Sequence, residues 1–433
     1  MRGSRLSTRT IAAVAVAALS ATGLAACGDD SGGGSSDKSI VVWTSVDQPI
    51  LDGLQKGIDP LAKTAGITIK LQRVDNINQV IMTKLNAKDK PDIAMIPQPG
   101  VVADIVKRGA AKPLDDVLDK AALEGSMVPG ALDAGTVDDK LYALLVNANI
   151  KSLVFYPKKA WDAAGYEAPD SIDALNALTD QIKGDGNTPW CMGVESDAAT
   201  GWPATDWFED LVMRYGGADG YNSWVTHETP FDSDVVRQSA AEFEKLFFTD
   251  GNVLGGRKAI VSTNFGTAGN PMFDKKPGCF MYKQGSFITG FFPKNIQADL
   301  DGEVGVFGFP PATAGGENPV LGGGDLAVML NDSDAAKEAM KILANKDIGV
   351  PAATGGSSFL SPFKDFDVSN YQGELKKAFA DVAYKATAFL FDGSDQMPGA
   401  VGAGTFWKDM TAWIAGDEDL DTALKNIDNS WPS

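Results

Sequence analysis

Aromatic and acidic side chains are interspersed in one stretch of this chain, residues 189–214. The chemistry that uses both is the binding of a sugar, because a sugar ring has apolar C–H faces and a rim of hydroxyls. Aromatic rings suit the faces, and carboxylates or amides suit the hydroxyls, in a mostly preformed cleft. The side chains of this kind are Trp190, Trp202, Trp207, Glu195, Ser196, Thr205, Asp206 and Asp210.

Ordinary helix chemistry gives a second interpretation of the same stretch. Thr205 or Asp206 would cap the N-terminus of a helix. Trp207 and Leu211 would then pack in the core of a domain. The sequence leaves both roles open for Trp207, whereas Trp202 lies in a Gly-Trp-Pro loop that favours contact with a ligand.

The sequence offers few residues that could form a catalytic or a metal site. The chain has one histidine, His227, and no Gly-x-Ser-x-Gly elbow, so a Ser-His-Asp triad would rest on that single side chain. One histidine with two distant thiols is a poor set of zinc ligands. This also argues against a protein that binds a metal or a siderophore. A secreted glycoside hydrolase stays as the alternative to a binding protein, although its acid pair would have to come from 57 acidic residues. We expect no metal and no cofactor.

The first residues follow the pattern of an export signal. Three arginines precede an apolar run at 11–25 that is too short to span a bilayer comfortably as a helix. Leu-Ala-Ala-Cys ends at Cys27 and resembles the bacterial lipobox, in which the chain is cut before the cysteine and acylated on it. We expect a signal peptide at 1–26, a lipid on Cys27 and a flexible Gly/Ser-rich tether at 27–38. A plain signal peptide with a chance cysteine is the alternative.

The charge balance is strongly acidic, with a formal net charge of −19 over 433 residues. It opposes nucleic-acid binding and disfavours an anionic ligand, although an acidic surface is also an ordinary route to solubility. A hydrophobic content of 44% is that of a folded protein. The chain is too long to fold around one hydrophobic core of ordinary size, which predicts two domains. No stretch after residue 26 is long and apolar enough to predict a transmembrane helix.

Cys191 and Cys279 remain after the cysteine of the lipobox. Two cysteines in an exported protein most often pair, and the bridge would close a loop of roughly 90 residues. Two free buried thiols are the alternative.

The first ordered part of the chain alternates between strands and helices. Apolar runs predict strands at 40–44, 68–74 and 92–97, with amphipathic helices between them. This order predicts a parallel sheet with right-handed crossovers. Ligands bind beyond the carboxyl ends of such strands, which here are residues 45–47 and 98–100.

The later part mixes short strands with helices. Residues 140–156 are nearly all strand-forming and suggest strands that pass from one domain to another. Further strands are expected at 304–310 and 325–330, and helices at 334–345, 372–385 and 406–415.

Several segments together resemble one family. The lipobox, the opening strand-helix-strand and the segments 189–207, 253–260, 271–288 and 406–432 resemble the carbohydrate-binding lipoproteins of bacterial ABC importers. The likeness is greatest to the α-glucoside-binding group, and it covers nearly all of the chain after the signal. Both remaining cysteines fall inside resembling segments, which supports their pairing.

The resemblance implies an α/β fold of the type II periplasmic-binding-protein kind, with a ligand cleft between two lobes. The first lobe would comprise 39–147 and 280–330, and the second, mostly helical lobe 148–279 and 331–433. The family also implies a monomeric binding component and no enzyme. Such a protein is lipid-anchored outside the cytoplasmic membrane and delivers a carbohydrate, an α-glucoside or an oligosaccharide, to a membrane permease.

The resemblance also assigns ligand-binding positions on both lobes. Gly324 and Asp325 have an alternative, because the run of glycines before Asp325 could form a tight turn that needs positive φ. The residues that match the family's ligand-facing segments are Ser45, Asp47, Gln98, Glu195, Trp202, Asp206, Gln284, Ser286, Gly324, Asp325, Asp395 and Phe406.

Overall fold

The computed structural model describes residues 38–87 and 89–432. The expected signal peptide at 1–26 and the lipidation site at Cys27 lie outside these residues, as does the tether except for its last residue. Within the described ranges, no helix has both the length and the hydropathy that crossing a membrane requires.

The first lobe is built on a six-stranded sheet. β1 (Ser39–Thr44) lies between β2 (Thr68–Arg73) and β3 (Ile93–Ile96) and runs parallel to both. Val42 of β1 pairs with Leu71 on one side and with Ile93 on the other. The parallel β-α-β-α-β opening that the sequence predicts is therefore confirmed.

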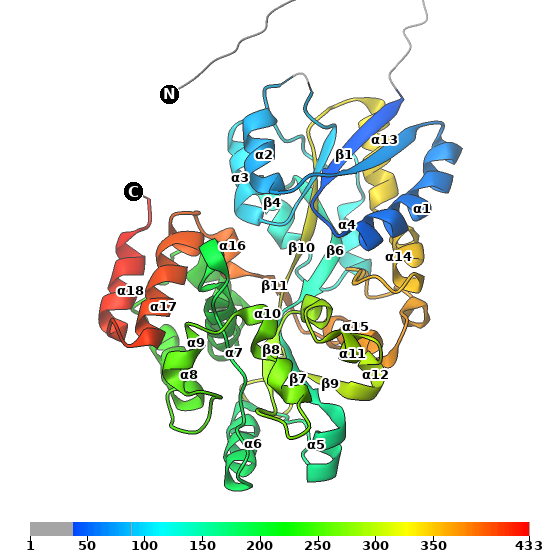
Figure 1. Cartoon of the computed structure of the whole chain (residues 1–433). Coiled ribbons are helices and arrows are strands. Elements are labelled where there is room, and N and C mark those ends of the chain that lie inside the picture. The colour runs from blue at the N-terminus through cyan, green and yellow to red at the C-terminus, as the bar shows by residue number, and fades with distance from the viewer. Residues whose placement is uncertain (1–37, 88, 433) are drawn as a thin grey trace, which may run out of the picture. The chain divides into compact units, whose positions relative to one another are not determined.

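Three further strands of this sheet come from distant parts of the chain. β10 (Val320–Met329) runs antiparallel to β3 and to β6 (Ala143–Ile150), and parallel to β11 (Phe389–Phe391). All residues of β10 are buried, as expected for a strand covered on both faces. Figure 1 shows β10 and β6 running from the part of the fold around β1 toward β11.

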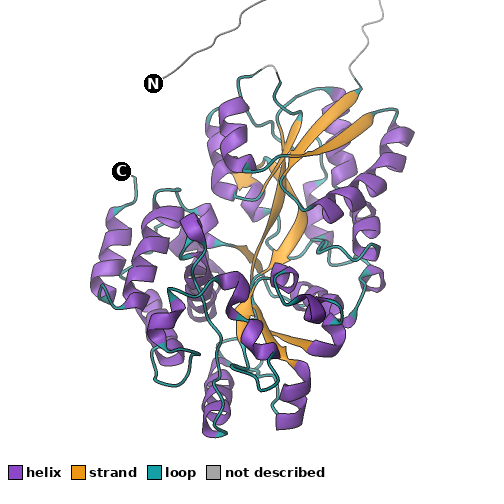
Figure 2. Cartoon of the chain, viewed as in Figure 1, coloured by secondary structure: helices purple, strands orange, loops and turns teal. Residues whose placement is uncertain are grey.

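Helices cover both faces of the first sheet (Figure 2). The chain connects the parallel strands through α1 (Gln48–Ala65) and α2 (Ile77–Lys84), and α3 (Pro99–Lys107) follows β3. α13 (Asp334–Leu343) and α14 (Val350–Thr354) pack against α1.

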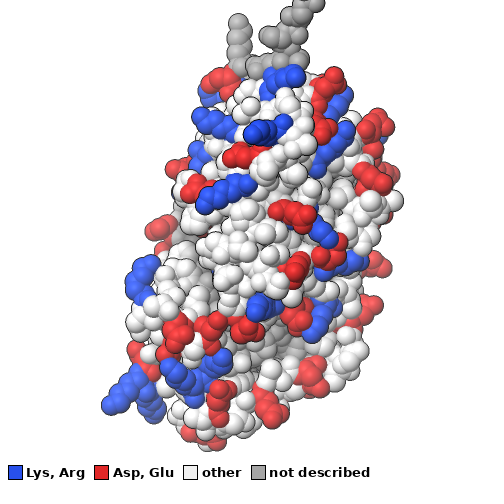
Figure 3. Space-filling model, turned by 90° about the vertical axis from the view of Figure 1, so that its right-hand side faces the viewer, with Lys and Arg blue, Asp and Glu red and all other residues white. Residues whose placement is uncertain are grey.

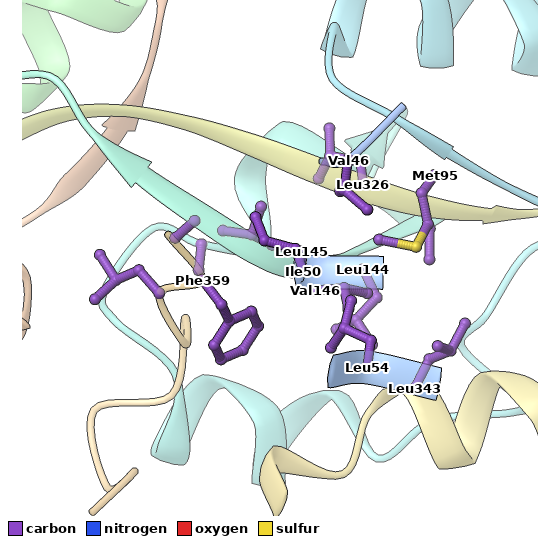
Figure 4. Close-up of a cluster of buried hydrophobic side chains, with 14 of the residues drawn as sticks. Val46, Ile50, Leu54, Met95, Leu144, Leu145, Val146, Leu326, Leu343 and Phe359 are labelled. Atoms are coloured by element: carbon purple, nitrogen blue, oxygen red, sulfur yellow. The ribbon is translucent and has the colours of Figure 1, made fainter. Parts of the chain in front are cut away.

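The apolar side of α1 fixes its place on the sheet. Ile50, Leu54 and Ile58 recur at helical spacing and are buried. Figure 4 shows Ile50 and Leu54 in one cluster with Met95 of β3 and Leu326 of β10. The helix and the sheet therefore share one core directly behind the loop that follows β1.

The second lobe has a smaller sheet, in which β7 (Leu153–Pro157) lies between β8 (Tyr282–Gln284) and β9 (Val304–Gly308), antiparallel to both. Figure 1 shows the longer helices α7 and α8 in this part of the fold. The longer helices of this lobe and the short α16 are α5 (Lys158–Ala164), α6 (Ile172–Gly184), α7 (Trp202–Val225), α8 (Asp234–Phe247), α15 (Glu374–Tyr384), α16 (Gly393–Gln396), α17 (Trp407–Ala415) and α18 (Leu420–Asn429).

Short elements complete the fold. They are β4 (Thr136–Val137), β5 (Lys140–Leu141), α4 (Lys120–Ser126), α9 (Arg257–Ile260), α10 (Phe265–Ala268), α11 (Lys294–Gln297) and α12 (Leu300–Glu303). The helices expected at 334–345, 372–385 and 406–415 are present as α13, α15 and α17.

Aromatic rings fill the core of the second lobe. Trp207 is 3% exposed, and its ring meets those of Trp190, Phe247 and Phe309 edge to face. Such edge contacts suit the charge distribution of aromatic rings. The structure therefore assigns Trp207 to the core, which decides the alternative that the sequence leaves open.

The expected lobe boundaries differ from the packing in two places. Residues 280–330 are expected in the first lobe, but β8 and β9 pair with β7 in the second sheet. Residues 331–433 are expected in the second lobe, but α13 and α14 pack against α1 of the first. The reason is that short apolar strands of the two sheets have similar composition, so the sequence does not indicate which sheet each one joins.

A disulfide joins Cys191 to Cys279, with their Cα atoms 5.4 Å apart. This confirms the expected pairing. The Cys191 N–H donates to the Met281 carbonyl over 2.8 Å, so the bridge reinforces two segments that already pair beside β8.

Charged side chains of both signs are interspersed on the face of the molecule drawn in Figure 3. That face carries no extended basic patch, in keeping with a net charge of −19. Nothing on it favours a nucleic acid as a partner.

Replacing both Cys191 and Cys279 by Ser should lower the free energy of unfolding by about 4–5 kcal/mol, because the bridge restricts a long loop of the unfolded chain. The two cysteines are 88 residues apart in the sequence. Denaturant titration without reductant measures the change. As a control, the unaltered protein unfolded in reductant should match the double variant. A double variant as stable as the oxidised protein would contradict this role of the bridge.

Candidate functional site

Lys151 lies where the chain passes from β6 of the first sheet to β7 of the second. Its backbone N–H donates to the Leu321 carbonyl over 2.8 Å, which ties the crossing to β10. Its ammonium bonds Asp206 Oδ1 at 3.0 Å and also Asp392. Only 12% of the Lys151 side chain is exposed. The crossing therefore places a nearly buried positive charge between acidic groups of the second lobe.

The start of α16 presents one of these acids. Asp392 caps the helix, because its Oδ1 accepts the Asp395 N–H at 2.9 Å and the Ser394 hydroxyl at 2.8 Å. The other oxygen of Asp392 accepts from Lys151. One carboxylate thus orders the helix start and holds the cation.

α7 presents the other acids. Asp206 and Glu209 are three residues apart near the start of the helix and lie on the same side of it. Glu209 is fully buried and accepts the backbone N–H groups of Gly393 at 2.7 Å and Ser394 at 3.1 Å. Glu209 therefore fastens α7 to the start of α16.

Burial and a shortage of cations set the protonation of this cluster. Burial raises the pKa of Asp206 to about 8 and that of Asp395 to about 7. Burial also opposes the charge of Asp392, but Lys151 outweighs it and lowers the pKa of that carboxyl. Burial lowers the pKa of Lys151, and Asp206, Asp392 and Asp395 together raise it well above its usual value. Lys151 and Asp392 therefore form the ion pair, while Asp206 and Asp395 take up protons near neutral pH.

Asp206, Glu209 and Asp392 come close enough together to suggest a metal site. In the structure, however, a lysine supplies the positive charge beside these carboxylates. Lys151 already bonds Asp206 and Asp392, and Glu209 accepts two backbone N–H groups. A divalent cation would meet the ammonium at short range, where repulsion is strong. The donor set therefore does not fit a metal.

Trp202 lies beside Lys151 at the first position of α7 and is half-buried. The Lys151 ammonium is 5.3 Å from the centroid of the indole ring. The indole N–H donates to Ser196 Oγ at 3.2 Å, and the ring of Phe287 lies 5.9 Å away. Part of the aromatic surface stays open next to the charged cluster, which is the arrangement that the sequence predicts for a ligand contact.

Trp407 is a second half-buried tryptophan at this place, and the sequence reasoning missed it. Its indole N–H donates to Ser394 Oγ at 3.2 Å. The sequence assigns its neighbour Phe406 instead, and this is wrong, because Phe406 is fully buried against Phe231 and Trp224. Neighbouring residues on a helix point about 100° apart, so only one of the two can face the site.

The first lobe reaches this site through Gln98, which follows β3. The Gln98 amide donates to Asp395 Oδ1 at 2.8 Å, and Asn78 of α2 donates to the Gln98 oxygen at 2.7 Å. This chain of hydrogen bonds links two of the expected residues, Gln98 and Asp395, across the lobes. Asn78 is an addition that no motif in the sequence marks.

Asp325 lies deeper, at the pairing of β10 with β6. It accepts from Asn147 Nδ2 at 2.9 Å, and burial raises its pKa to about 6. The tight turn that the sequence leaves open as the alternative for Gly324 is absent, since this glycine lies within β10 with a φ of 153°. A Cβ there would come within 2.1 Å of the Asn147 carbonyl. Glycine at 324 therefore serves the close approach of two strands.

The other expected residues occupy the margins of the site. Ser45 and Asp47 follow β1, the first half-buried and the second exposed, and the charge of Asp47 contributes to the raised pKa of Asp325. Gln284 and Ser286 are 4% and 7% exposed. Both side chains bond the backbone of the protein itself: Gln284 accepts the Gly285 N–H, and Ser286 accepts the Ile150 N–H. They offer little surface to a ligand.

An open hollow of about 690 Å³ adjoins Gln98 and Asp395. α3 lines it from the first lobe, and the α16 segment, the end of α7 and Trp431 line it from the second. Its volume is that of a small-molecule site. Trp202 and Asp206 do not line this hollow, which meets the charged cluster on its Asp395 side.

The pH dependence of stability tests the protonation of this site. Asp206, Asp395 and Asp325 have folded pKa values of about 8, 7 and 6, whereas the unfolded value is about 3.9. The folded state thus binds more protons than the unfolded state between about pH 4 and 8. The free energy of unfolding should fall as pH rises through this window, and Glu209, whose pKa burial raises well above its usual value, adds to the fall.

Denaturant titrations at a series of pH values measure this slope. Asp206→Asn cannot ionise and should reduce the slope over the whole window, with the largest relative effect between about pH 7 and 8, above the pKa of Asp395. Glu374→Gln, at an exposed position of α15, is the matched control and should keep the slope of the unaltered protein. A slope that Asp206→Asn leaves unchanged would show that Asp206 is ionised throughout.

Known proteins are similar to this chain in sequence. Residues 47–347 match the family of bacterial extracellular solute-binding proteins. The osmoprotective compounds-binding protein GgtB of Synechocystis sp. is 34% identical over 379 residues, which cover 88% of this chain and 89% of GgtB. The alpha-glucosides-binding periplasmic protein AglE of Rhizobium meliloti is 37% identical over 383 residues, which cover 86% of this chain and 82% of AglE.

The fold is also that of a solved receptor. The crystal structure of the bacterial solute receptor AcbH superposes with a TM-score of 0.75, covering 90% of this chain and 98% of AcbH at 18% identity. The expected two-lobed α/β fold is therefore confirmed. With a family match over most of its length and relatives more than 30% identical, the chain belongs to the bacterial extracellular solute-binding proteins.

Proposed function

We propose that this protein captures a carbohydrate, an α-glucoside or an oligosaccharide, outside the cytoplasmic membrane and delivers it to a membrane permease of an ABC importer. The observation that carries the proposal is Trp202, half-exposed beside the carboxylates around Lys151. An open indole face suits the C–H face of a sugar ring, and Asp395, the half-buried carboxyl of the cluster, has surface left for the hydroxyls. The names of GgtB and AglE, which bind osmoprotective compounds and α-glucosides, support this ligand class.

The electrostatics favour a neutral ligand. Lys151 is neutralised by Asp392, and the raised pKa values of Asp206 and Asp395 reduce the remaining negative charge near neutral pH. A charged solute would meet no uncompensated partner in this cluster. Hydroxyl groups, by contrast, donate to carboxylates and accept from protonated carboxyls equally well.

The arrangement of the chain supports a binding cycle of opening and closing. The chain passes between the sheets at Lys151, and the hydrogen bond from Gln98 to Asp395 joins the two lobes at the candidate site. A ligand that contacts both lobes would stabilise the closed form, as in other hinge proteins. The permease would then recognise the closed, loaded protein.

The lipobox at Cys27 supports lipid anchoring to the membrane, with residues 27–38 as the tether between lipid and fold. A tethered monomer samples solute near a permease without being part of it. Hydrolysis of the ligand is not part of the proposal, because Asp206, Glu209 and Asp392 are all bonded to Lys151 or to backbone N–H groups. A glycosidase needs two carboxyls free to reach the scissile bond.

The experiment is calorimetry of the soluble protein with a panel of neutral sugars: glucose, trehalose, sucrose, maltose and longer maltooligosaccharides. At least one glucoside should bind, remain chemically unchanged, and stabilise the protein by about 2.7 kcal/mol at a concentration of 100 times its Kd. Turnover of the ligand, or binding of none of the panel, would contradict the proposal.

A pair of variants locates the binding. Trp202→Ala should weaken the binding of the best ligand by about 1–3 kcal/mol, because a large aromatic contact is lost. Trp202→Phe keeps a ring and should lose less. Trp43→Phe, a half-buried tryptophan of β1 that bonds Gln72, is the control and should bind normally. Unchanged affinity in Trp202→Ala would place the sugar elsewhere.

A further inference from the structure

Aromatic rings continue from Trp202 to the surface of the second lobe. The ring of Phe265 lies 4.9 Å from Trp202 and 5.2 Å from Phe291. Phe291 is 49% exposed, more than Leu254 or Val368, the other exposed large apolar side chains of the described residues. The three rings form one row, defined here as Trp202, Phe265 and Phe291, that leads away from the charged cluster around Lys151.

The backbone makes room for this row. Gly266 follows Phe265 at the start of α10, and a Cβ there would come within 2.7 Å of the Phe291 ring. Any side chain at 266 would displace Phe291 from Phe265. The Asn264 side chain caps the same short helix by accepting the Gly266 N–H at 2.9 Å, which orders the helix start that carries Phe265.

Polar groups edge the row. Glu195 pairs with Asn264: the Phe265 N–H donates to the Glu195 carbonyl at 3.1 Å, and Asn264 Nδ2 donates to Glu195 Oε2 at 2.7 Å. Hydrogen bonds from the Asp197 N–H and from Asn264 lower the pKa of Glu195, so it is an ionised acceptor at neutral pH. Ser196 is bonded to Trp202. Apolar faces beside fixed acceptors are the surface that a sugar ring requires.

We propose that Phe265, Phe291 and Glu195 form an outer saccharide subsite that continues the site at Trp202. The occupant is a further neutral sugar ring of the same ligand, stacked on Phe291 with its hydroxyls toward Glu195. The inference rests on the proposed function and narrows it, because a monosaccharide at Trp202 would leave this subsite empty. The protein is then built for a ligand of at least two rings.

The test measures affinity along a series of glucose, maltose, maltotriose and maltotetraose by calorimetry. In the unaltered protein, affinity should rise by about tenfold at the chain length whose last ring reaches Phe291, as expected for a stacking contact of about 1.4 kcal/mol. Phe291→Ala should remove that step and leave the shorter sugars with unchanged affinity. Phe291→Tyr keeps the ring face and should restore the step.

Controls separate the possible outcomes. Val368→Ala removes another exposed apolar side chain, one outside the row, and should keep the whole series intact. A series without any step, a step retained in Phe291→Ala, or an equal loss for every sugar would each overturn the outer subsite. If no sugar binds the unaltered protein, the proposed function itself fails. If Phe291→Ala does not fold, Glu195→Gln supplies the same test, since it should also reduce the affinity gained at that step.

Discussion

The ammonium of Lys151 is the interaction on which the junction of the two lobes depends. It lies at the crossing from β6 to β7 and bonds Asp206 of α7 and Asp392 at the start of α16. These segments are far apart in the sequence, and the cation joins their carboxylates at one place. Trp202 lies beside the same ammonium, Asp395 donates its backbone N–H to Asp392, and Trp407 bonds Ser394 next to it.

Burying such a cluster is unfavourable unless every charge has a partner. The structure meets this condition with backbone N–H groups on Glu209 and with protons, because burial raises the pKa of Glu209 as it does those of Asp206 and Asp395. A second buried pair lies next to it, where Lys283 bonds Asp210 at 2.7 Å and Asp210 accepts from Ser152. Lys151, from the crossing before β7, and Lys283, from β8, thus both bond acids of α7, which supports one wall of the site.

The sequence predicted those parts of the fold that depend on local patterns. The alternation of apolar runs with amphipathic helices indicated β1 to β3, and two cysteines in an exported chain indicated their bridge. It did not predict Lys151, because a single lysine in a strand-like run has no pattern that marks it as central. It also placed β8 and β9 in the wrong lobe, since the pairing of short strands depends on contacts between distant segments. At 406 the sequence favoured an aromatic side chain that the structure buries completely, because the face on which a helical residue lies depends on the packing of the whole helix.

The most direct measurement is the stability of Lys151→Met, which removes the charge and keeps the apolar stem. At pH 8 its free energy of unfolding should be lower than that of the unaltered protein by about 3–5 kcal/mol, because Asp392 and Asp206 lose their cation. At pH 5 the loss should be smaller, because Asp206 is already protonated there and only Asp392 loses its cation. Adding Asp392→Asn to the variant should recover part of the loss at pH 8. A Lys151→Met variant as stable as the unaltered protein at pH 8 would contradict the central place given to this cation.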